Sequence, residues 1–166
     1  NTFSGAHWDL ATFTAFISAF VATVAMWWIY FSLSAEKASE VIASSDNRGH
    51  LARVVYTYVH LLLIIAIVLV AAADEFVLAH PLGHTGIGTM VAMIGGTALY
   101  LIANILFKRL VFNSHPRSHY IGLALLTILC VAASHVPPVA VAVATTLILV
   151  LVAIQETVVV MRKNSH

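Results

Sequence analysis

Residues 54–79 read VVYTYVHLLLIIAIVLVAAADEFVLA, and this stretch decides the fold. A helix needs about 20 predominantly apolar residues to cross the hydrocarbon core of a bilayer, and this stretch supplies them. Four further apolar stretches lie at residues 10–31, 86–107, 120–135 and 139–161. The pattern predicts an all-α, polytopic transmembrane helix bundle with five spans, which form a single domain over residues 1–166.

The composition independently indicates a membrane protein. Hydrophobic residues make up 61% of the chain and charged residues 9%, whereas a soluble domain carries about 25% charged residues. A secreted disulfide scaffold is excluded because Cys130 is the single cysteine and lies inside an apolar stretch. The formal net charge of +1 gives no basic footprint for nucleic acid. The partner that the composition predicts is therefore the lipid bilayer.

The basic residues fall on one side of the predicted spans. They occupy the first connection, the third connection and the C-terminal tail, and none falls in the N-terminal segment or in the second and fourth connections. Because lysine and arginine accumulate on the cytoplasmic side of membrane proteins, we expect the N-terminus outside and the C-terminus in the cytoplasm. The basic residues are Lys37, Arg48, Arg53, Lys108, Arg109, Arg117, Arg162 and Lys163.

Two ionisable side chains are predicted to lie at similar depth near the cytoplasmic end. His60 follows Arg53 by about 10 Å along the second span, and Glu156 precedes Arg162 by about 9 Å along the fifth. An opposed imidazole and carboxylate can exchange a proton near neutral pH, and ionisable groups in spans often mark ion or proton paths. Alternatively, His60 is neutral and bonds a tyrosine or a backbone carbonyl. The separate alternative for Glu156 is that it snorkels to the interface or pairs with Arg53 or Arg162.

Further polar side chains are predicted to support this path. Tyr100 and Asn104 are expected to line a polar cavity near the inner half of the third span. Asp74 and Glu75 are expected to form an acidic outer entrance that concentrates cations or protons. One face of the second span holds a histidine near one end and a carboxylate near the other, so it is predicted to avoid lipid. Its members are Tyr56, His60, Ile67, Ala71, Asp74 and Leu78.

Small and aromatic residues predict how the helices pack and where the interface lies. Gly88, Ala92 and Gly96 recur at four-residue spacing, which lets helix backbones approach closely. Tryptophan and tyrosine are enriched at the membrane–water interface, and such residues gather at the predicted cytoplasmic end. The interfacial aromatics are Trp27, Trp28, Tyr30 and Tyr58.

No metal site, cofactor or catalytic site is predicted. Pro81 and Gly83 prevent His80 and His84 from sharing one helix face, and the titratable residues at the external ends are expected to be hydrated. A retinal Schiff base needs a lysine deep in a span, and a membrane b-type haem needs facing histidines, whereas only His60 is deep. Phosphate-binding, nucleophile-elbow and metalloprotease motifs are absent, so an enzyme is the weakest class. The external residues are His7, Asp9, Asp74, Glu75, His80, His84 and His135.

Several short motifs together resemble one bacterial membrane-protein family. They are WWIYF at residues 27–31, YTYVHL at 56–61, AHP at 79–81, GGTALYL at 95–101 and FKR at 107–109. This combination resembles the bacterial low-temperature-requirement A (LtrA) family over nearly the whole chain. The matching part is the C-terminal half of a usual family member. The Glu-Leu-Phe-Phe-Asp-Leu-Val-like motif of the N-terminal half is not found here, and neither is a second motif with Gly-Glu in a leucine-rich helix.

The resemblance implies a multi-pass protein of the bacterial inner membrane, and the family name implies no reaction. It gives weight to an aromatic group with one histidine near the cytoplasmic end. Aromatic anchoring explains the tryptophans and tyrosines of this group but not the histidine one turn deeper. The group consists of Trp27, Trp28, Tyr30, Tyr56, Tyr58 and His60.

Two functions are compatible with these observations. The first hypothesis is a transporter- or channel-like bundle that handles a proton or small ion, with His60 and Glu156 at its inner site. The alternative is a non-catalytic membrane scaffold or half-bundle that docks on another chain or on a missing N-terminal half. Its docking face is the row of Gly88, Ala92 and Gly96. A closed polar path is difficult to build from five spans, so a homo-oligomer or a missing half is expected.

Overall fold

The computed structural model describes residues 9–31, 35–45 and 47–164, and these residues form helices and turns with no strand among them. Within this part of the chain, five helices are long and apolar enough to cross a membrane. They are Leu10–Phe31, Arg48–Ala79, Ile87–Phe112, Arg117–His135 and Pro138–Arg162. The predicted all-α fold with five membrane-crossing helices is therefore confirmed.

Some of these long helices are built from several segments that follow one another without a break. The second joins two α-helical segments through a π-helical one, and so does the third, while the fourth ends in a 3-10 turn. In chain order the segments are α1 (Leu10–Phe31), α2 (Ala35–Ala43), α3 (Arg48–Arg53), η1 (Val54–Val59), α4 (His60–Ala79), α5 (Ile87–Met90), η2 (Val91–Gly95), α6 (Gly96–Phe112), α7 (Arg117–Ala132), η3 (Ala133–His135) and α8 (Pro138–Asn164).

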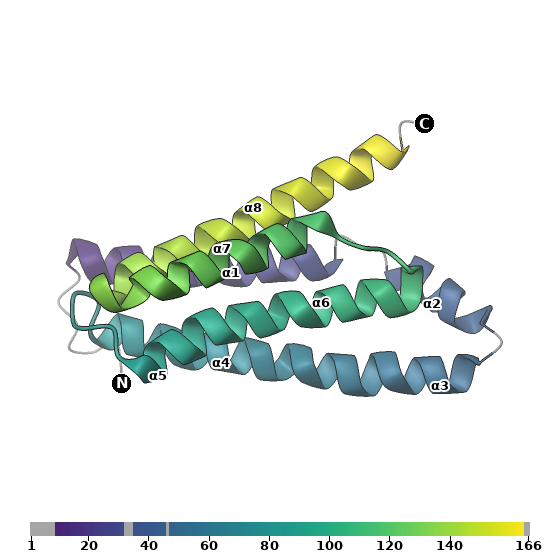
Figure 1. The fold of residues 1–166 in the computed structure, drawn as a ribbon, viewed down its shortest axis with the longest axis horizontal. Coiled ribbons are helices and arrows are strands. Elements are labelled where there is room, and N and C mark those ends of the chain that lie inside the picture. The colour runs from purple at the N-terminus through teal and green to yellow at the C-terminus, as the bar shows by residue number, and fades with distance from the viewer. Residues whose placement is uncertain (1–8, 32–34, 46, 165–166) are drawn as a thin grey trace.

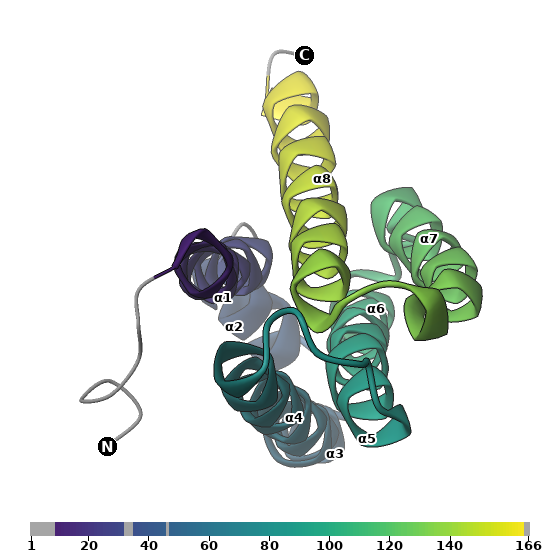
Figure 2. The same ribbon diagram turned by 90° about the vertical axis from the view of Figure 1, so that its left-hand side faces the viewer.

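The helices pack in two layers. α4 and α6 lie side by side in one layer, and α8 lies between α1 and α7 in the other (Figure 1, Figure 2). Contacts of α4 with α1 and of α6 with α7 close the layers around one apolar core. The C-terminal part of α8 diverges from the other helices at the end of the bundle where α2 and α3 lie (Figure 1).

Small residues set the closest helix contacts. A Cβ atom added to Gly96 would lie 3.0 Å from Leu69 Cβ of α4, and one added to Gly122 of α7 would lie 2.9 Å from Val152 Cγ2 of α8. Membrane helices associate largely through such close backbone approach, because lipid and side chains are equally apolar. The buried alanines of α1 belong to the same core: Ala15, Ala22 and Ala25.

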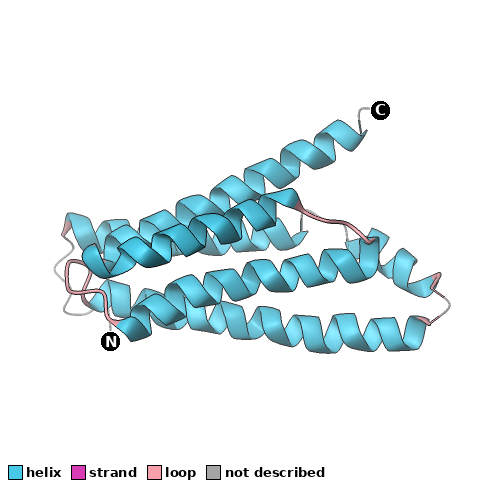
Figure 3. Cartoon of the chain, in the orientation of Figure 1, coloured by secondary structure: helices cyan, strands magenta, loops and turns pink. Residues whose placement is uncertain are grey.

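Two of the long helices extend further than the apolar stretches predict. The second begins at Arg48 instead of residue 54, and the third continues to Phe112, where Asn113 ends it in the left-handed conformation with φ 47°. Hydropathy marks only the part of a helix that hydrocarbon surrounds, whereas backbone hydrogen bonding continues beyond it. Lys108 and Arg109, which the charge pattern assigns to a connection, therefore belong to α6. The connection itself is the short loop that follows Asn113 (Figure 3).

The short helix α2 contacts this end of the bundle. Ala38 and Ile42 of α2 pack with Val55 of η1 and Val111 of α6 in a small second core. Both α2 residues are at most 5% exposed. The ends of the second and third long helices are thus held together by an additional apolar contact.

Candidate functional site

A row of polar side chains runs along the buried face of α6. Thr97, Tyr100, Asn104 and Lys108 are each at most 3% exposed. Because residues three or four positions apart lie on one face of a helix, this row extends for about 16 Å through the bundle interior. We call these four residues the α6 polar row.

Lys108 ends the row in a cluster contributed by three helices. Its Nζ forms an ion pair with Oε1 of Glu156 in α8 and lies 3.3 Å from Nε2 of His119 in α7. Nδ1 of His119 lies 3.1 Å from Oγ of Ser118 and 4.0 Å from Oε1 of Glu156. We call Lys108, Ser118, His119 and Glu156 the charged cluster. It is closed off from the surface, since the side chains of Lys108, His119 and Glu156 are 3%, 0% and 11% exposed.

The hydrogen bonds of the charged cluster determine the form of His119. The Lys108 ammonium carries donors only, so Nε2 of His119 accepts its hydrogen bond. Nδ1 then carries the ring proton and donates it to the Ser118 hydroxyl. His119 is neutral in this arrangement, and the formal charges of Lys108 and Glu156 cancel.

His60 lies in a separate site, the aromatic groove, formed by α1, α4 and α6. Its Nε2 lies 2.9 Å from the Tyr30 hydroxyl, and the two rings meet edge to face with centroids 5.7 Å apart. Among the described residues, His60 Nδ1 has no hydrogen-bond partner although it is buried. The groove has a volume of about 300 Å³, and Trp27, Phe31 and Tyr100 line it with aliphatic neighbours.

Tyr100 connects the aromatic groove with the α6 polar row. Its side chain lines the groove, and its hydroxyl donates a 2.5 Å hydrogen bond to the Met26 carbonyl of α1. One turn later, Asn104 donates from Nδ2 to the Tyr100 carbonyl over 2.9 Å. Lys108 follows after one further turn. Polar side chains therefore continue along α6 from the aromatic groove to the charged cluster.

The structure gives His60 and Glu156 separate partners, so it favours the alternative in which His60 bonds a tyrosine over an opposed pair of His60 and Glu156. His60 bonds a tyrosine, Tyr30, and Glu156 pairs with Lys108. Lys108 can reach Glu156 because it lies inside α6 and not in a connection. Tyr100 and Asn104 lie between the two sites, so the residues predicted for an inner path are linked by α6 instead of by a direct contact.

The face predicted on the second span is not turned into the bundle as a unit. Tyr56 and Ile67 are 50% and 45% exposed, and Asp74 is half-buried. A π-helical turn holds more residues than an α-helical one, so η1 shifts Tyr56 from its place on a regular helical wheel. Packing instead selects a face of aliphatic and small residues: Leu63, Ala66, Val70, Ala73 and Val77.

The residues predicted for an outer entrance lie far from the charged cluster. Asp74 and Glu75 follow His60 by about 20 Å along α4, toward the opposite end of the bundle, and Glu75 is exposed. At that end, Asp9 Oδ1 accepts a 2.8 Å hydrogen bond from the Thr12 amide in the first turn of α1. His7 lies outside the described residues. In the part of the chain that the structure describes, no three His, Cys, Asp or Glu side chains are placed to hold a metal.

The small-residue row does not form one packing face. Gly96 contacts α4 inside the chain, whereas a Cβ atom on Gly88 would meet nothing within 4 Å. Ala92 is half-buried and lies in η2, whose π-helical turns interrupt regular four-residue spacing. Of the predicted interfacial aromatics, Tyr30 is turned toward His60, and the others are exposed: Trp27, Trp28 and Tyr58.

Sequence reasoning missed Lys108, Ser118 and His119. The charge pattern places Lys108 in a connection, and His60 alone among the histidines is singled out as deep, whereas α6 buries Lys108 and α7 buries His119 near the helix ends that form the charged cluster. A signal for Lys108 was present, because it continues the four-residue spacing of Tyr100 and Asn104. No comparable pattern marks His119, which follows a loop and starts a helix.

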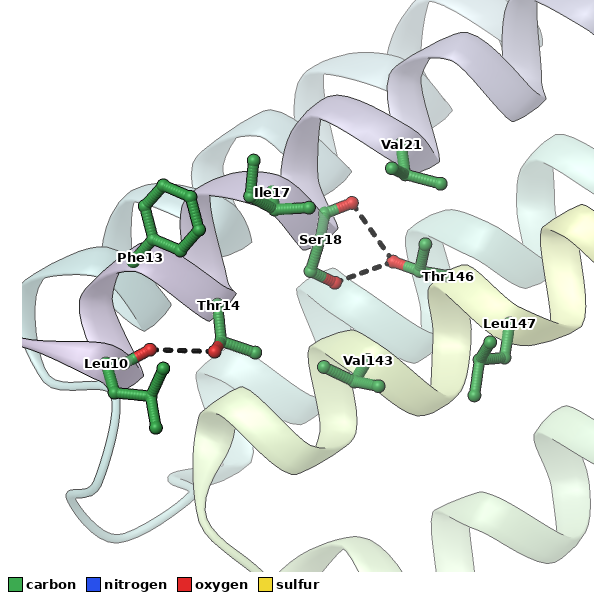
Figure 4. A pocket seen from close by; sticks show the side chains of 9 residues that line it. All are labelled: Leu10, Phe13, Thr14, Ile17, Ser18, Val21, Val143, Thr146 and Leu147. Carbon is green, nitrogen blue, oxygen red and sulfur yellow. Dashed lines mark hydrogen bonds between the residues drawn. The ribbon is translucent and has the colours of Figure 1, made fainter.

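A second groove lies between α1 and α8, nearer the opposite end of the bundle (Figure 4). The Ser18 and Thr146 hydroxyls meet at its floor, 2.8 Å apart. Its volume is about 430 Å³. The remaining walls are largely apolar, and they are formed by Leu10, Phe13, Ile17, Val21, Val143 and Leu147. We call it the α1–α8 groove.

Comparison with known proteins agrees with the motifs of the sequence. The family described as "Bacterial low temperature requirement A protein (LtrA)" matches residues 1–154. An uncharacterized protein of Rhizobium meliloti (strain 1021) is 32% identical over 140 residues, which cover 84% of this chain and 34% of that protein. The chain thus spans about a third of the length of the curated relative it matches. No solved structure matches the chain.

Proposed function

The chain belongs to the bacterial low temperature requirement A (LtrA) family, and we propose that it handles a proton or small ion within the membrane. It acts as part of a transporter- or channel-like helix bundle, and its role is non-enzymatic. The observation that carries the proposal is the charged cluster, in which an ion pair and a neutral histidine are held between α6, α7 and α8.

Burial of these charges is hard to explain by stability alone. Desolvation of two charges offsets most of their attraction, and apolar residues of similar size stabilise a core equally well or better. Ionisable residues inside membrane helices are rare for this reason, and they commonly mark ion or proton paths. The burial of Lys108, His119 and Glu156 therefore supports ion handling over a purely structural role.

The α6 polar row supplies a route between the charged cluster and the aromatic groove. The Tyr100 hydroxyl can donate and accept a hydrogen bond through one oxygen, which proton relay requires, whereas the Asn104 amide has separate donor and acceptor atoms and orients hydrogen-bonded groups along the route. In this proposal Tyr30 and His60 form a second proton-binding station, bordered by the Tyr56 ring 6.1 Å from His60. Asp74 and Glu75 concentrate cations at the far end of the bundle.

The basic end of the bundle faces the cytoplasm in this proposal, and the membrane is the bacterial inner membrane. The helix ends that carry the basic residues gather where α2 and α3 lie, together with the C-terminal end of α8 (Figure 1). Positive residues near the ends of spans are retained in the cytoplasm. This orientation places the charged cluster in the cytoplasmic half of the bundle.

Proton flux into proteoliposomes tests the proposal. Vesicles that contain the chain and an internal pH dye receive a potassium diffusion potential set with valinomycin. We expect proton flux in the parent and none in Glu156→Gln, because the neutral amide cannot hold the cation or the proton. Glu40→Gln is the matched control, since Glu40 is an exposed acidic residue of α2 and lies outside the route.

A double variant keeps this test independent of folding. Lys108→Gln combined with Glu156→Gln leaves no unpaired buried charge, so it should fold and still conduct no protons. Equal flux in the parent and in the double variant would contradict the proposal. So would the absence of proton movement in the parent chain under both an imposed potential and an imposed gradient of Na⁺ or K⁺.

A half-bundle that docks on another chain, or on the rest of a longer protein, is the second candidate. It is favoured by the relative of which this chain covers 34% and by the α1–α8 groove, where Phe13 and Leu147 are 52% and 59% exposed. Gly96 no longer serves as a docking residue, because it packs against Leu69 within the chain.

Filling the α1–α8 groove tests this second candidate. Leu147→Trp should shift the chain to smaller assemblies in native mass spectrometry without lowering its melting temperature in detergent. Ile128→Trp on the exposed face of α7 is the control, since Ile128 is 68% exposed and lies outside the groove. Unchanged assemblies in Leu147→Trp would count against docking through this face.

A further inference from the structure

We propose that Lys108 is a resident counter-cation of Glu156, and that a monovalent alkali cation binds Glu156 in exchange for the proton that Lys108 carries. This inference rests on the proposed function and names its substrate class: Na⁺ or K⁺ moving against H⁺. It starts from the position of one atom, Lys108 Nζ, which contacts both Glu156 and His119.

Lys108 Nζ occupies a place suited to a small cation. It forms the ion pair with the Glu156 carboxylate and lies 3.3 Å from a ring nitrogen of His119, and the Ser118 hydroxyl adjoins that ring. A lysine ammonium is a compact point charge on a flexible stem, so it can withdraw when another cation takes the carboxylate. A guanidinium cannot imitate this step, because it is planar and larger and keeps its charge.

Charge balance selects a monovalent ion and the loss of a proton. The cluster now holds one positive and one negative formal charge, on Lys108 and Glu156. A second positive charge beside them in a buried site would be uncompensated, which is costly in a low-dielectric interior. The cluster stays neutral when the ammonium becomes an amine as the cation arrives. A divalent ion would leave one charge in excess even then.

The exchange is balanced in atoms and charge. Lys–NH₃⁺···⁻OOC–Glu and M⁺ give Lys–NH₂, Glu–COO⁻···M⁺ and H⁺. One N–H bond of Lys108 breaks, its electron pair stays on nitrogen, and nothing is oxidised or reduced. The first acceptor within reach is Nε2 of His119, which takes the proton while Nδ1 releases its own toward Ser118. His119 is thus a relay for the departing proton.

The groups that surround Lys108 leave few other sources for this proton. Among the described side chains, the titratable groups that face it are His119 from α7 and Glu156 from α8, with Tyr100 two turns earlier on α6. From α2 and η1, three of the described side chains that pack in the second core with α6 are apolar. They are Ala38, Ile42 and Val55. Arg109 and Arg117 are exposed.

Proton release on cation binding is the direct test. The purified chain in detergent, in weakly buffered choline chloride with a pH dye, receives NaCl or KCl, and MgCl₂ in a separate sample. We expect Na⁺ or K⁺ to release roughly one proton per chain from the parent and none from Lys108→Arg, since arginine keeps its charge. Arg109→Lys is the control and should release as many protons as the parent.

Each outcome of the release experiment decides the inference. Thermal melting establishes that Lys108→Arg is folded, and the double variant Lys108→Gln with Glu156→Gln, which should release no proton, provides a second folded reference. No release from the parent overturns the exchange, and so does equal release from Lys108→Arg. Release by Mg²⁺ at least equal to that by Na⁺ and K⁺ overturns the choice of a monovalent ion.

Proteoliposomes separate the exchange from the broader proposal. With the membrane potential clamped at zero, an external pulse of Na⁺ or K⁺ should raise the internal pH in the parent but not in Lys108→Arg. Proton flux that responds to an imposed potential but not to alkali cations would contradict the exchange and leave the broader proposal of ion handling intact. No proton movement under either driving force would overturn both.

Discussion

α8 makes two buried polar contacts in its membrane-crossing part, one toward each end. The two contacts differ in whether one member can be lost without leaving an unpaired buried charge. Thr146 meets Ser18 across the α1–α8 groove, and its hydroxyl also lies 2.8 Å from the carbonyl of Ala142 in its own helix. Glu156 meets Lys108, whose ammonium is held, among the described residues, by Glu156 of α8 and His119 of α7. A hydroxyl pair tolerates the loss of one member, whereas a buried charge pair does not. The comparison separates a polar contact that joins two helices and can lose a member from one in which each side chain requires the other.

The largest expected effect comes from breaking the charged contact. Lys108→Gln leaves Glu156 as an uncompensated buried charge and should lower the free energy of unfolding by about 3–5 kcal/mol. The measurement is denaturant unfolding in micelles, followed by tryptophan fluorescence. Arg109→Gln, at an exposed position of the same helix, should change stability by less than about 0.5 kcal/mol. A double variant with Glu156→Gln should recover most of the loss, and a Lys108→Gln protein as stable as the parent would refute the contrast.

Packing around the charged cluster should show the next largest effect. A Cβ atom on Gly122 would lie 2.9 Å from both Leu101 Cδ1 and Val152 Cγ2. Gly122→Ala should therefore lower the free energy of unfolding by about 1–3 kcal/mol. Gly88→Ala has open space and should gain up to about 1 kcal/mol from helix propensity. Melting temperatures of the two variants that shift in the same direction would contradict this reading.

The hydrogen bond in the aromatic groove should rank third. Tyr30→Phe removes the only partner that the structure gives to the ring nitrogens of His60 among the described residues. We expect a loss of about 1–2 kcal/mol, the usual effect of leaving one part-buried polar group unsatisfied. Tyr58→Phe, at a 59% exposed position, is the matched control. The same loss from both variants would show that the hydroxyl of Tyr30 contributes nothing through His60.

The hydroxyl pair should show the smallest effect. In a double-mutant cycle of Ser18→Ala and Thr146→Val, the coupling energy should be about 0.6 kcal/mol, as found for side-chain hydrogen bonds between membrane helices. Thr146 retains Ala142 as an acceptor when Ser18 is changed. The cycle is measured by unfolding in micelles, and a coupling as large as that between Lys108 and Glu156 would erase the difference between the two contacts.

The five long helices can be predicted from the sequence, because a helix that crosses the hydrocarbon core must have about 20 predominantly apolar residues. Each predicted apolar stretch corresponds to one helix of the structure, and family membership follows from the motifs. Both depend on local sequence, so neither requires knowledge of which helices touch. The orientation in the membrane stays a prediction from the basic residues.

The charged cluster could not be predicted, because it depends on which helices meet. Counting basic residues treats Lys108 as part of a connection, yet one additional turn of α6 places it inside the bundle. Equal depth makes a contact between His60 and Glu156 one of the alternatives, but depth carries no information on orientation, and α4 turns His60 toward Tyr30 of α1. A helical wheel also assumes regular winding, which η1 and η2 do not keep. The identities of the residues were informative, but their partners were set by tertiary packing.

The π-helical segments have a consequence for the lengths of the two helices that contain them. A turn closed by i to i+5 hydrogen bonds accommodates one residue more than an ordinary turn. Removing one residue inside Val54–Val59 or Val91–Gly95 can therefore be absorbed by rewinding that segment, and the helix on either side keeps its orientation. A deletion within His60–Ala79 or Gly96–Phe112 cannot be absorbed in this way, because those segments are α-helical. It rotates every later side chain of the helix about the helix axis. Single-residue deletions should thus be tolerated at η1 and η2 and not in the helices that follow them.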